Sequence, residues 1–404
     1  MNPVLRQLGG YPLASFQDLK AELAADGEPL FDFSIGDPIE PTPAFIRDAL
    51  VAGVPEVSQY PTAAGLRGLR EAVAAWVRRR FGVTVDPDRH VLPTAGSKEA
   101  IFHLPLGVVD PHGSRRSVVW ADPGYQVYER GMLFAGGTSD PVTLAEETGW
   151  RLDLPSLATD RLAGAAIAWL NYPHNPTGAT TGLADLRAQL ATAREHGIVL
   201  CSDECYVDVH PPHAEPPPSL LQVAGNPDDP DLSGLLVAFS LSKRSGMTGY
   251  RSGALVGDPE LIAAQRLLRP NIGTASPEFV QRAAIAAWGD DEHVATRREV
   301  FEAKRQVLLP FLAEQGLRTS GSEATFYVWF AAPDGDDAAY AEALLRHRIV
   351  ASPGRAFGPG GRGWLRLALV PDVDGCERAV ARWAEAIRVG DVPATGADRT
   401  VPEP

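Results

Sequence analysis

Two short stretches of this 404-residue chain place charged residues just past apolar runs: Ser202-Asp203-Glu204-Cys205-Tyr206 and Ser240-Leu241-Ser242-Lys243-Arg244. The apolar runs, Ile198 to Cys201 and Leu235 to Phe239, have the length and composition of buried parallel strands. In open α/β sheets, ligands bind just beyond the carboxyl ends of the strands. The sequence therefore predicts an α/β sheet with an acid and a lysine at its binding edge.

Lys243 has neighbours that suit a carbonyl-binding lysine. Two serines precede it and Arg251 follows, so donors for an anion are at hand while the amine stays available for a Schiff base. The isolated tetrapeptide Ser-x-Ser-Lys is more often an exposed loop. The Asp203 stretch, and the position of Arg251 after the lysine, favour a binding site instead.

Composition narrows the class of protein. The formal net charge of −14 argues against nucleic acid or an anionic membrane as the main partner. With 45% hydrophobic residues, and at about 100–200 residues per domain, the chain can form two or three domains. Cys201, Cys205 and Cys376 are too few for a disulfide framework, and a metal site at the first two would lack a second ligand pair. We expect reduced thiols, no metal, and a cytoplasmic protein without export signal or membrane span.

Further motifs carry a resemblance to a known family. Ser-x-Ser-Lys followed by Gly249-Tyr250-Arg251-Ser252-Gly253 resembles the Schiff-base signature of class I/II aminotransferases, fold-type I enzymes that use pyridoxal 5'-phosphate (PLP). Asp203-x-x-Tyr206 and Asn175-Pro176-Thr177-Gly178 match other motifs of the family, in the family's order. The resemblance implies a large domain with a mostly parallel central sheet flanked by helices, plus a smaller α+β domain built from both termini.

The resemblance also implies how the chain is divided. We expect an arm and part of the small domain at residues 1–44, the large PLP-binding domain at 45–285, the small domain at 286–390 and a disordered tail at 391–404. Within these parts, the patterns predict a strand over Phe31–Ile35, an irregular loop over Pro211–Asp231 and a helical stretch from Glu278 to Leu312.

Each matching residue receives a role from the resemblance. Lys243 would hold the cofactor aldehyde and move a proton at the substrate Cα, Asp203 would keep the pyridine nitrogen protonated, and Tyr206 would assist at the phenolic oxygen. Tyr125 would stack on the ring and Asn175 would donate to the phenolic oxygen. The cofactor phosphate would be bound by Gly96, Ser97, Ser240, Ser242 and Arg251, and by Tyr60 reaching across a homodimer. Lys98 aligns with the same phosphate-binding turn, where it reaches the phosphate, the substrate or only water.

Three residues would bind the substrate α-carboxylate: Gly36, Asn175 and Arg366. A glycine at position 36 permits close backbone approach. Arg366 lies within an apolar strand, where a charge is costly unless paired. From the pattern alone, Arg366 serves either a structural ion pair or a carboxylate ligand.

The implied activity is ping-pong transfer of an amino group from L-glutamate to a keto acid. Within the family, the motifs look most like succinyldiaminopimelate aminotransferase of bacterial lysine synthesis, whose acceptor is N-succinyl-2-amino-6-oxopimelate. Aminotransferases for aspartate, alanine or aromatic amino acids are the first alternative. A PLP-dependent lyase of the same fold is the second, since it shares the Schiff base and differs in the bond broken. A ligand sensor fused to a DNA-binding domain would need a basic extension, which this acidic chain lacks.

Overall fold

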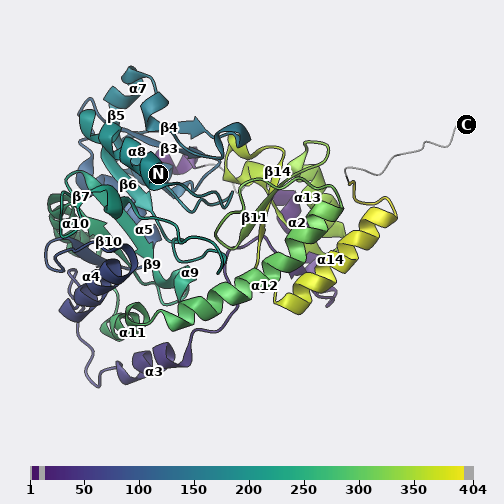
Figure 1. Ribbon diagram of the computed structural model, residues 1–404, viewed down its shortest axis with the longest axis horizontal. Coiled ribbons are helices and arrows are strands. Elements are labelled where there is room, and N and C mark those ends of the chain that lie inside the picture. The colour runs from purple at the N-terminus through teal and green to yellow at the C-terminus, as the bar shows by residue number, and fades with distance from the viewer. Residues whose placement is uncertain (1, 9–13, 395–404) are drawn as a thin grey trace, which may run out of the picture.

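The computed structural model describes residues 2–8 and 14–394, which form a larger and a smaller lobe (Figure 1). The larger lobe is built on a seven-stranded sheet of order β2-β10-β9-β6-β5-β3-β4. Its strands are β2 (Val91–Thr94), β3 (Ser117–Asp122), β4 (Thr138–Thr143), β5 (Ala165–Leu170), β6 (Val199–Asp203), β9 (Leu235–Ser240) and β10 (Gly253–Gly257). Only β10 runs antiparallel to its neighbours. The predicted, mostly parallel α/β sheet is confirmed.

Both faces of this sheet are covered by helices, because alternate side chains point to opposite faces. On β9, Leu235, Val237 and Phe239 join one core cluster, while Leu236 and Ala238 join another. The first cluster is closed by α3 (Ala44–Ala52), α4 (Arg67–Phe81), α8 (Leu183–Glu195) and α11 (Glu278–Gly289). The second is closed by α5 (Ser97–Val108), α6 (Val127–Phe134) and α10 (Pro259–Ile272).

The smaller lobe takes residues from both ends of the chain. Its antiparallel sheet has the order β11 (Tyr327–Ala331), β14 (Trp364–Ala368) and β13 (Ser352–Pro353), beside α13 (Asp337–Arg346) and α14 (Val373–Arg388). The N-terminal strand β1 (Phe31–Asp32) pairs in parallel with β12 (Ile349–Val350). Leu19 and Leu23 of α2 (Ala14–Ala25) pack on the same core. A small α+β unit built from both termini was predicted and is observed.

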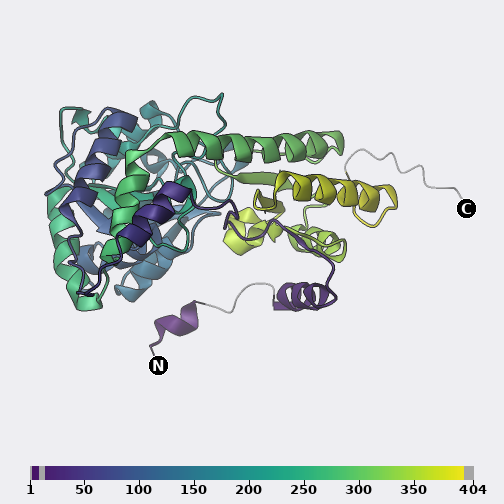
Figure 2. The same ribbon diagram turned by 90° about the horizontal axis from the view of Figure 1, so that it is seen from below.

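One long helix, α12 (Glu292–Glu314), runs from the larger lobe into the smaller one (Figures 1 and 2). It continues from α11, whose Ala287 and Trp288 belong to the large-lobe core. Farther along, Phe301, Leu308 and Phe311 of α12 are part of the small-lobe core. The joint between α11 and α12 therefore lies where the lobes are connected.

The remaining elements are short: α1 (Val4–Gln7), α7 (Thr159–Gly164), α9 (Leu241–Arg244), β7 (Gly225–Asn226), β8 (Asp229–Pro230), and 3-10 turns at Glu146–Thr148, Leu154–Ser156, Leu220–Val223, Gly354–Phe357 and Pro359–Gly361. The loop predicted over Pro211–Asp231 thus contains a 3-10 turn and a β7–β8 hairpin. No helix in the described ranges is long and apolar enough to cross a membrane.

Two predicted elements differ from the structure. The strand predicted over Phe31–Ile35 pairs only at its first two residues, because the chain then turns toward the pocket at Gly36. The helical stretch from Glu278 to Leu312 is two helices, since α11 stops at Gly289, a residue that favours helix ends. The divisions at 44–45 and 285–286 stay predictions. Of the predicted tail, residues 395–404 lie outside the described residues.

Candidate active site

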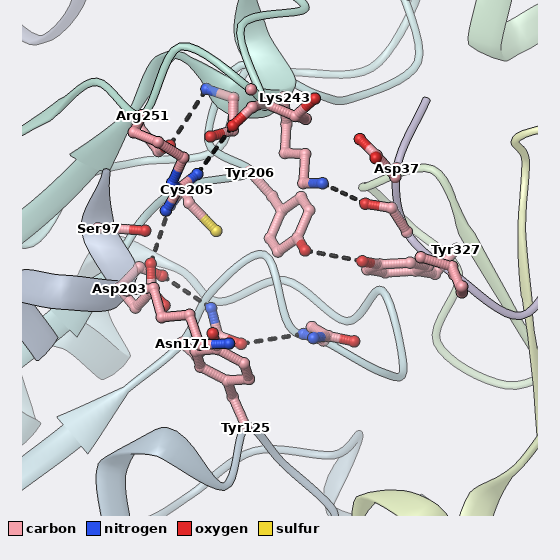
Figure 3. Close-up of a pocket in the computed structure, with 18 residues that line it drawn as sticks. Asp37, Ser97, Tyr125, Asn171, Asp203, Cys205, Tyr206, Lys243, Arg251 and Tyr327 are labelled. Carbon is pink, nitrogen blue, oxygen red and sulfur yellow. Dashed lines mark hydrogen bonds between the residues drawn. The ribbon is translucent and has the colours of Figure 1, made fainter. Parts of the chain in front are cut away.

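A pocket lies between the lobes, at the carboxyl ends of β5, β6 and β9 (Figure 3). Its volume is about 560 Å³, within the range of small-molecule sites. The pocket brings together most of the predicted site residues: Gly36, Ser97, Lys98, Tyr125, Asn175, Asp203, Tyr206, Ser240, Ser242, Lys243 and Arg251. Asn175, Asp203 and Lys243 share one cavity because they end or follow the parallel strands β5, β6 and β9, which finish at one edge of the sheet.

Lys243 is held on a short helical turn that directly follows β9. Ser240 caps this turn by accepting a hydrogen bond from the Ser242 backbone N–H at 3.1 Å. The Lys243 Nζ donates to the carbonyl oxygen of Gly36. Burial lowers the pKa of Lys243 to about 8. Near neutral pH its amine is therefore neutral more often than that of an ordinary lysine, whose pKa is 10.5, and a base or nucleophile needs this neutral form.

Asp203 ends β6 and is only 3% exposed. Its carboxylate accepts from the Tyr128 hydroxyl at 3.0 Å and from the Cys205 backbone N–H at 3.3 Å. Burial raises its pKa to about 6. In the described ranges, no Lys, Arg or His forms an ion pair with it. A buried carboxylate without a cation is costly, so the site suits a ligand that brings a positive charge.

The other end of the pocket is built from hydrogen-bond donors. Ser97 begins α5 and Gly96 precedes it with φ 80°, a conformation that favours glycine. A Cβ on Gly96 would lie 2.5 Å from Arg251 Nη2, so the glycine lets the guanidinium approach the helix start. Arg251 Nη1 donates to the Thr248 carbonyl at 2.9 Å. The start of α5, the serine side chains and the Arg251 guanidinium together form a suitable binding site for a phosphate. Lys98 is exposed and also lines the pocket.

Arg366 was predicted to serve either an ion pair or a carboxylate ligand. It donates to Asn175 Oδ1 at 2.8 Å and to the Ser34 carbonyl at 2.7 Å, and packs between the rings of Tyr327 and Phe357. Its Nε is buried without a hydrogen-bond partner. No carboxylate in the described part of the chain pairs with Arg366, although the residue is only 6% exposed. The structural ion pair is therefore wrong for the described residues, and the carboxylate role stays a prediction.

Glycine at position 36 is required by its surroundings. A Cβ built there would overlap the hydroxyl of Tyr327, which itself bonds the Tyr206 hydroxyl at 2.8 Å. The close approach observed at Gly36 is to an aromatic side chain, and its predicted place beside the substrate α-carboxylate stays a prediction.

Three predicted site residues do not line the pocket. Gly96 directly precedes Ser97 and Arg366 donates to Asn175, so both adjoin the lining residues. The third is Tyr60. Its side chain is fully exposed, with a relative exposure of 101%. The segment 270–277 does not line this cavity. Ala275, Ser276 and Pro277 border a second cavity that shares Arg251 with the first.

Several lining residues were missed from the sequence: Asp37, Asn171, Cys205, Thr248 and Tyr327. Asn171 donates to the Asp203 carbonyl at 2.8 Å and accepts from the Asn175 backbone N–H at 3.0 Å. Its position just past β5 was a usable signal. Tyr327 gave none, because an aromatic residue in an apolar strand reads as core.

The family model for class I and II aminotransferases matches residues 28–382 of this chain. The chain belongs to this family. Members use PLP, so this protein is a PLP-dependent aminotransferase.

Similar proteins agree with this assignment. The LL-diaminopimelate aminotransferase of Aquifex aeolicus is 36% identical over 371 residues, covering 90% of this chain and 93% of that protein. A crystal structure of an aminotransferase from Neisseria meningitidis has 34% identity and a TM-score of 0.86, covering 95% of this chain and 99% of that one. A single mutant of Thermus thermophilus aspartate aminotransferase has 26% identity and a TM-score of 0.87, with coverage of 95% and 99%. The expected fold-type I architecture is confirmed.

The pocket of this aminotransferase fits PLP on its own chemistry. Its wall holds a buried carboxylate that lacks a cation, a set of phosphate-type donors, and a lysine amine with a lowered pKa. Asp203, Arg251 and Lys243 are the residues that would hold its ring nitrogen, phosphate and aldehyde.

Proposed function

We propose that this aminotransferase moves an amino group between L-glutamate and a keto acid of the diaminopimelate type, in a ping-pong reaction. One observation carries the proposal: the buried guanidinium of Arg366, which pairs with no described carboxylate, donates to Asn175 and packs on Tyr327. Both of these residues line the pocket that holds Lys243. Such a fork binds a carboxylate in two parallel hydrogen bonds. An amino-acid α-carboxylate bound there would present its Cα toward Lys243.

The residues then divide the work. Bound PLP supplies an aldehyde for the amino group and a ring that accepts electrons from Cα. Lys243 removes the proton from Cα and returns one during the second half of the cycle. The Asp203 carboxylate stabilises positive charge on the ring nitrogen, and Tyr206 and Asn175 donate near the phenolic oxygen. Tyr125 covers one face of the ring.

The acceptor is proposed from the relatives and from two charges at the pocket wall. The curated relative from Aquifex is named for LL-diaminopimelate, not for its succinylated form. Asp37 and Lys98 both line the pocket, and neither forms an ion pair with another described residue. The far end of LL-diaminopimelate carries one ammonium and one carboxylate, which match these two charges. A succinylated end carries only carboxylates. We therefore favour the free amino acid, in diaminopimelate and lysine synthesis, over N-succinyl-2-amino-6-oxopimelate.

The first experiment follows the absorption spectrum of the PLP-loaded protein. L-glutamate should convert the band of the bound cofactor to that of its aminated form, and 2-oxoglutarate should reverse the change. Lys243→Ala should lose the conversion, because no amine of matching reach moves the proton. Release of ammonia and pyruvate in place of a new amino acid would establish the lyase alternative and overturn the proposal.

The choice of acceptor is tested with Asp37→Asn. We expect kcat/KM for LL-diaminopimelate with 2-oxoglutarate to fall about tenfold, the usual worth of one charge-assisted contact. The glutamate half-reaction should change little, because glutamate has no second ammonium. Asp153→Asn, which removes an exposed carboxylate away from the pocket, is the control. Equal losses for both amino acids would argue against a role of Asp37 in selection.

A second candidate acceptor is oxaloacetate, favoured by the likeness to the Thermus aspartate aminotransferase. The same assay with L-aspartate decides between them. A kcat/KM for aspartate above that for LL-diaminopimelate would select the aspartate activity.

The proposal includes a homodimer with shared sites. Tyr60 and several apolar side chains of the preceding segment are exposed in the single chain: Ile35, Ile39, Val51, Val54 and Val57. A contiguous exposed apolar segment of this kind favours a protein interface. A partner seated there would bring its Tyr60 to the phosphate end of the neighbouring pocket.

A further inference from the structure

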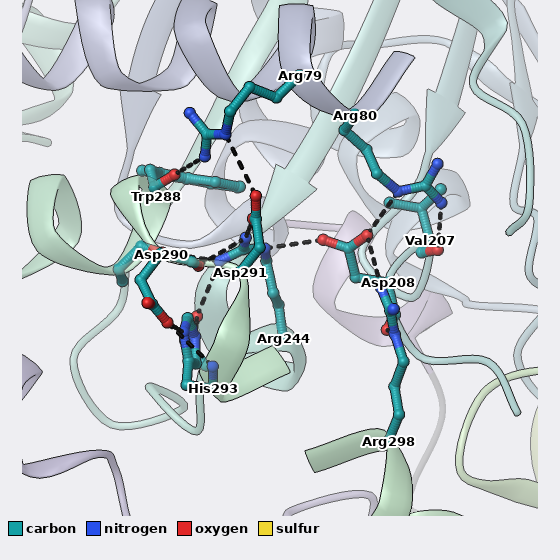
Figure 4. Close-up of polar contacts among 12 residues, drawn as sticks. Arg79, Arg80, Val207, Asp208, Arg244, Trp288, Asp290, Asp291, His293 and Arg298 are labelled. Atoms are coloured by element: carbon teal, nitrogen blue, oxygen red, sulfur yellow. Dashed lines mark hydrogen bonds and ion pairs between the residues drawn. The ribbon is translucent and has the colours of Figure 1, made fainter. Parts of the chain in front are cut away.

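Arg244, the residue that follows Lys243, does not line the pocket and lies in a buried polar cluster (Figure 4). Consecutive residues of a helical turn project about 100° apart, so Arg244 lies behind the lysine. Arg244 is 3% exposed, and its guanidinium lies 5.6 Å from the ring centre of Trp76 and 5.3 Å from that of Trp288. None of these contacts involves a group assigned to cofactor or substrate.

Arg244 donates hydrogen bonds to two distant parts of the chain. Its Nε donates to Asp208 at 2.8 Å, five residues after Asp203. Its Nη1 donates to the Ala287 carbonyl at 2.8 Å, and its Nη2 donates to the Asp291 carboxylate at 2.5 Å. The lysine turn is thereby joined both to the Asp203 stretch and to the α11–α12 joint. Because the planar guanidinium is hydrogen-bonded at several points, it holds the turn that carries Lys243 in place.

The next residue makes a second link to the same joint. The Ser245 hydroxyl bonds His293 Nε2 at 2.8 Å, and His293 Nδ1 bonds Asp290 at 2.6 Å. Asp291 occupies the N-cap position of α12, yet its side chain makes no capping bond. Its carboxylate accepts from Arg244 and from Arg79 Nε at 3.2 Å. An N-cap bond is normally stabilising, so this carboxylate serves the lysine turn in preference to its own helix.

Asp208 completes the cluster from the other side. It is 4% exposed and accepts from Arg80 Nε at 2.9 Å, while Arg298 of α12 donates from its Nε to the Asp208 carbonyl at 2.8 Å. Burial alone would raise the pKa of Asp208, but Arg244 and Arg80 lower it below the usual value. The carboxylate is therefore charged and pairs with both arginines.

We infer that Arg244 is a positioning residue for Lys243, which it anchors from behind to the α11–α12 joint and to Asp208. The inference rests on the proposed role of Lys243. The lysine thus keeps its place in the larger lobe, while α12 leads from the same anchor into the smaller lobe. Loss of the anchor frees the turn and lets water reach the lysine amine.

The test compares Arg244→Gln and Arg244→Lys with Arg80→Gln, a matched control that breaks a bond to the same Asp208 from α4. In the cofactor-free protein, the pH dependence of Lys243 acylation is followed by mass spectrometry. Because burial lowers the pKa of Lys243, the midpoint should rise by about 0.5 unit or more in Arg244→Gln and less in Arg244→Lys. In the loaded enzyme, kcat should fall about 10- to 100-fold with little change in KM. Arg80→Gln should lower the unfolding midpoint without moving either readout.

If Arg244→Gln does not fold, Asp291→Asn tests the same inference. Asp291 is about half exposed, so its loss is milder, and it should shift the acylation midpoint in the same direction. Folded Arg244 and Asp291 variants that titrate and turn over like Arg80→Gln would overturn the inference. In that case the wild-type response to glutamate would still stand. Absence of that response in the wild type would instead remove the proposed function.

Discussion

Asp203 and Glu204 are neighbouring buried carboxyl groups with different surroundings. Burial raises the pKa of Asp203 to about 6 and that of Glu204 to about 7. The proposed cofactor brings a cation to Asp203. Glu204 Oε1 accepts from the Leu220 backbone N–H at 2.8 Å, but its Oε2 is buried without a partner. At the scale of residues, the buried Asp203 carboxylate has a proposed role in binding the cofactor, whereas burial of the Glu204 carboxylate only destabilises the fold.

This cost predicts a pH dependence of stability. Since the pKa of Glu204 is higher in the folded protein than its ordinary 4.5, the stabilising proton is fully bound below pH 4.5. That stabilisation is lost as the pH rises through about 7. Glu204→Gln, which is neutral throughout, should flatten the change in urea midpoint between pH 5 and pH 8. The exposed Glu71→Gln should keep the wild-type dependence, and an unchanged slope in Glu204→Gln would contradict the assignment.

At the scale of elements, the strands that end in motifs were predictable. The runs that became β5, β6 and β9 are apolar and short, and each is followed at once by polar residues. The start of α5 at Gly96 and Ser97 was also readable, because small residues precede an apolar helix pattern. Arg366 was found because a charge among apolar neighbours is costly. Each of these signals lies within a few neighbouring residues, so the sequence alone was enough to find them.

Other features depend on contacts between distant elements, which no local pattern contains. The antiparallel insertion of β10 between β2 and β9 is set by pairing across the sheet. Tyr327 reaches the site only because β11 faces the turn at Gly36. Asp291, at the start of α12, accepts a hydrogen bond from Arg244, which lies 47 residues earlier, and no local pattern predicts that contact. The direction and register of the strands, and the contacts behind the turn that holds Lys243, therefore became known only from the structure.

At the scale of the whole molecule, residues of both lobes line the pocket, but Tyr60, which was predicted to bind the cofactor phosphate, does not. Tyr327 and Gly36 come from segments that build or adjoin the smaller lobe, and Lys243 comes from the larger. Tyr60 is fully exposed in the same chain. If two chains share each site, a defect in Tyr60 of one subunit must be felt in the pocket of the other.

This arrangement predicts complementation between two defective variants. Lys243→Ala lacks the catalytic amine, and Tyr60→Phe lacks a hydroxyl for the cofactor phosphate while keeping the ring at the interface. Each variant alone should be poorly active at a PLP concentration that leaves Tyr60→Phe mostly empty. After mixing and reassociation, about a quarter of wild-type activity should return, because half of randomly formed two-fold dimers are hybrids with one intact pocket of two. If Tyr60 acted within its own subunit, every hybrid would pair one pocket without the lysine with one without the hydroxyl, and mixing would restore nothing.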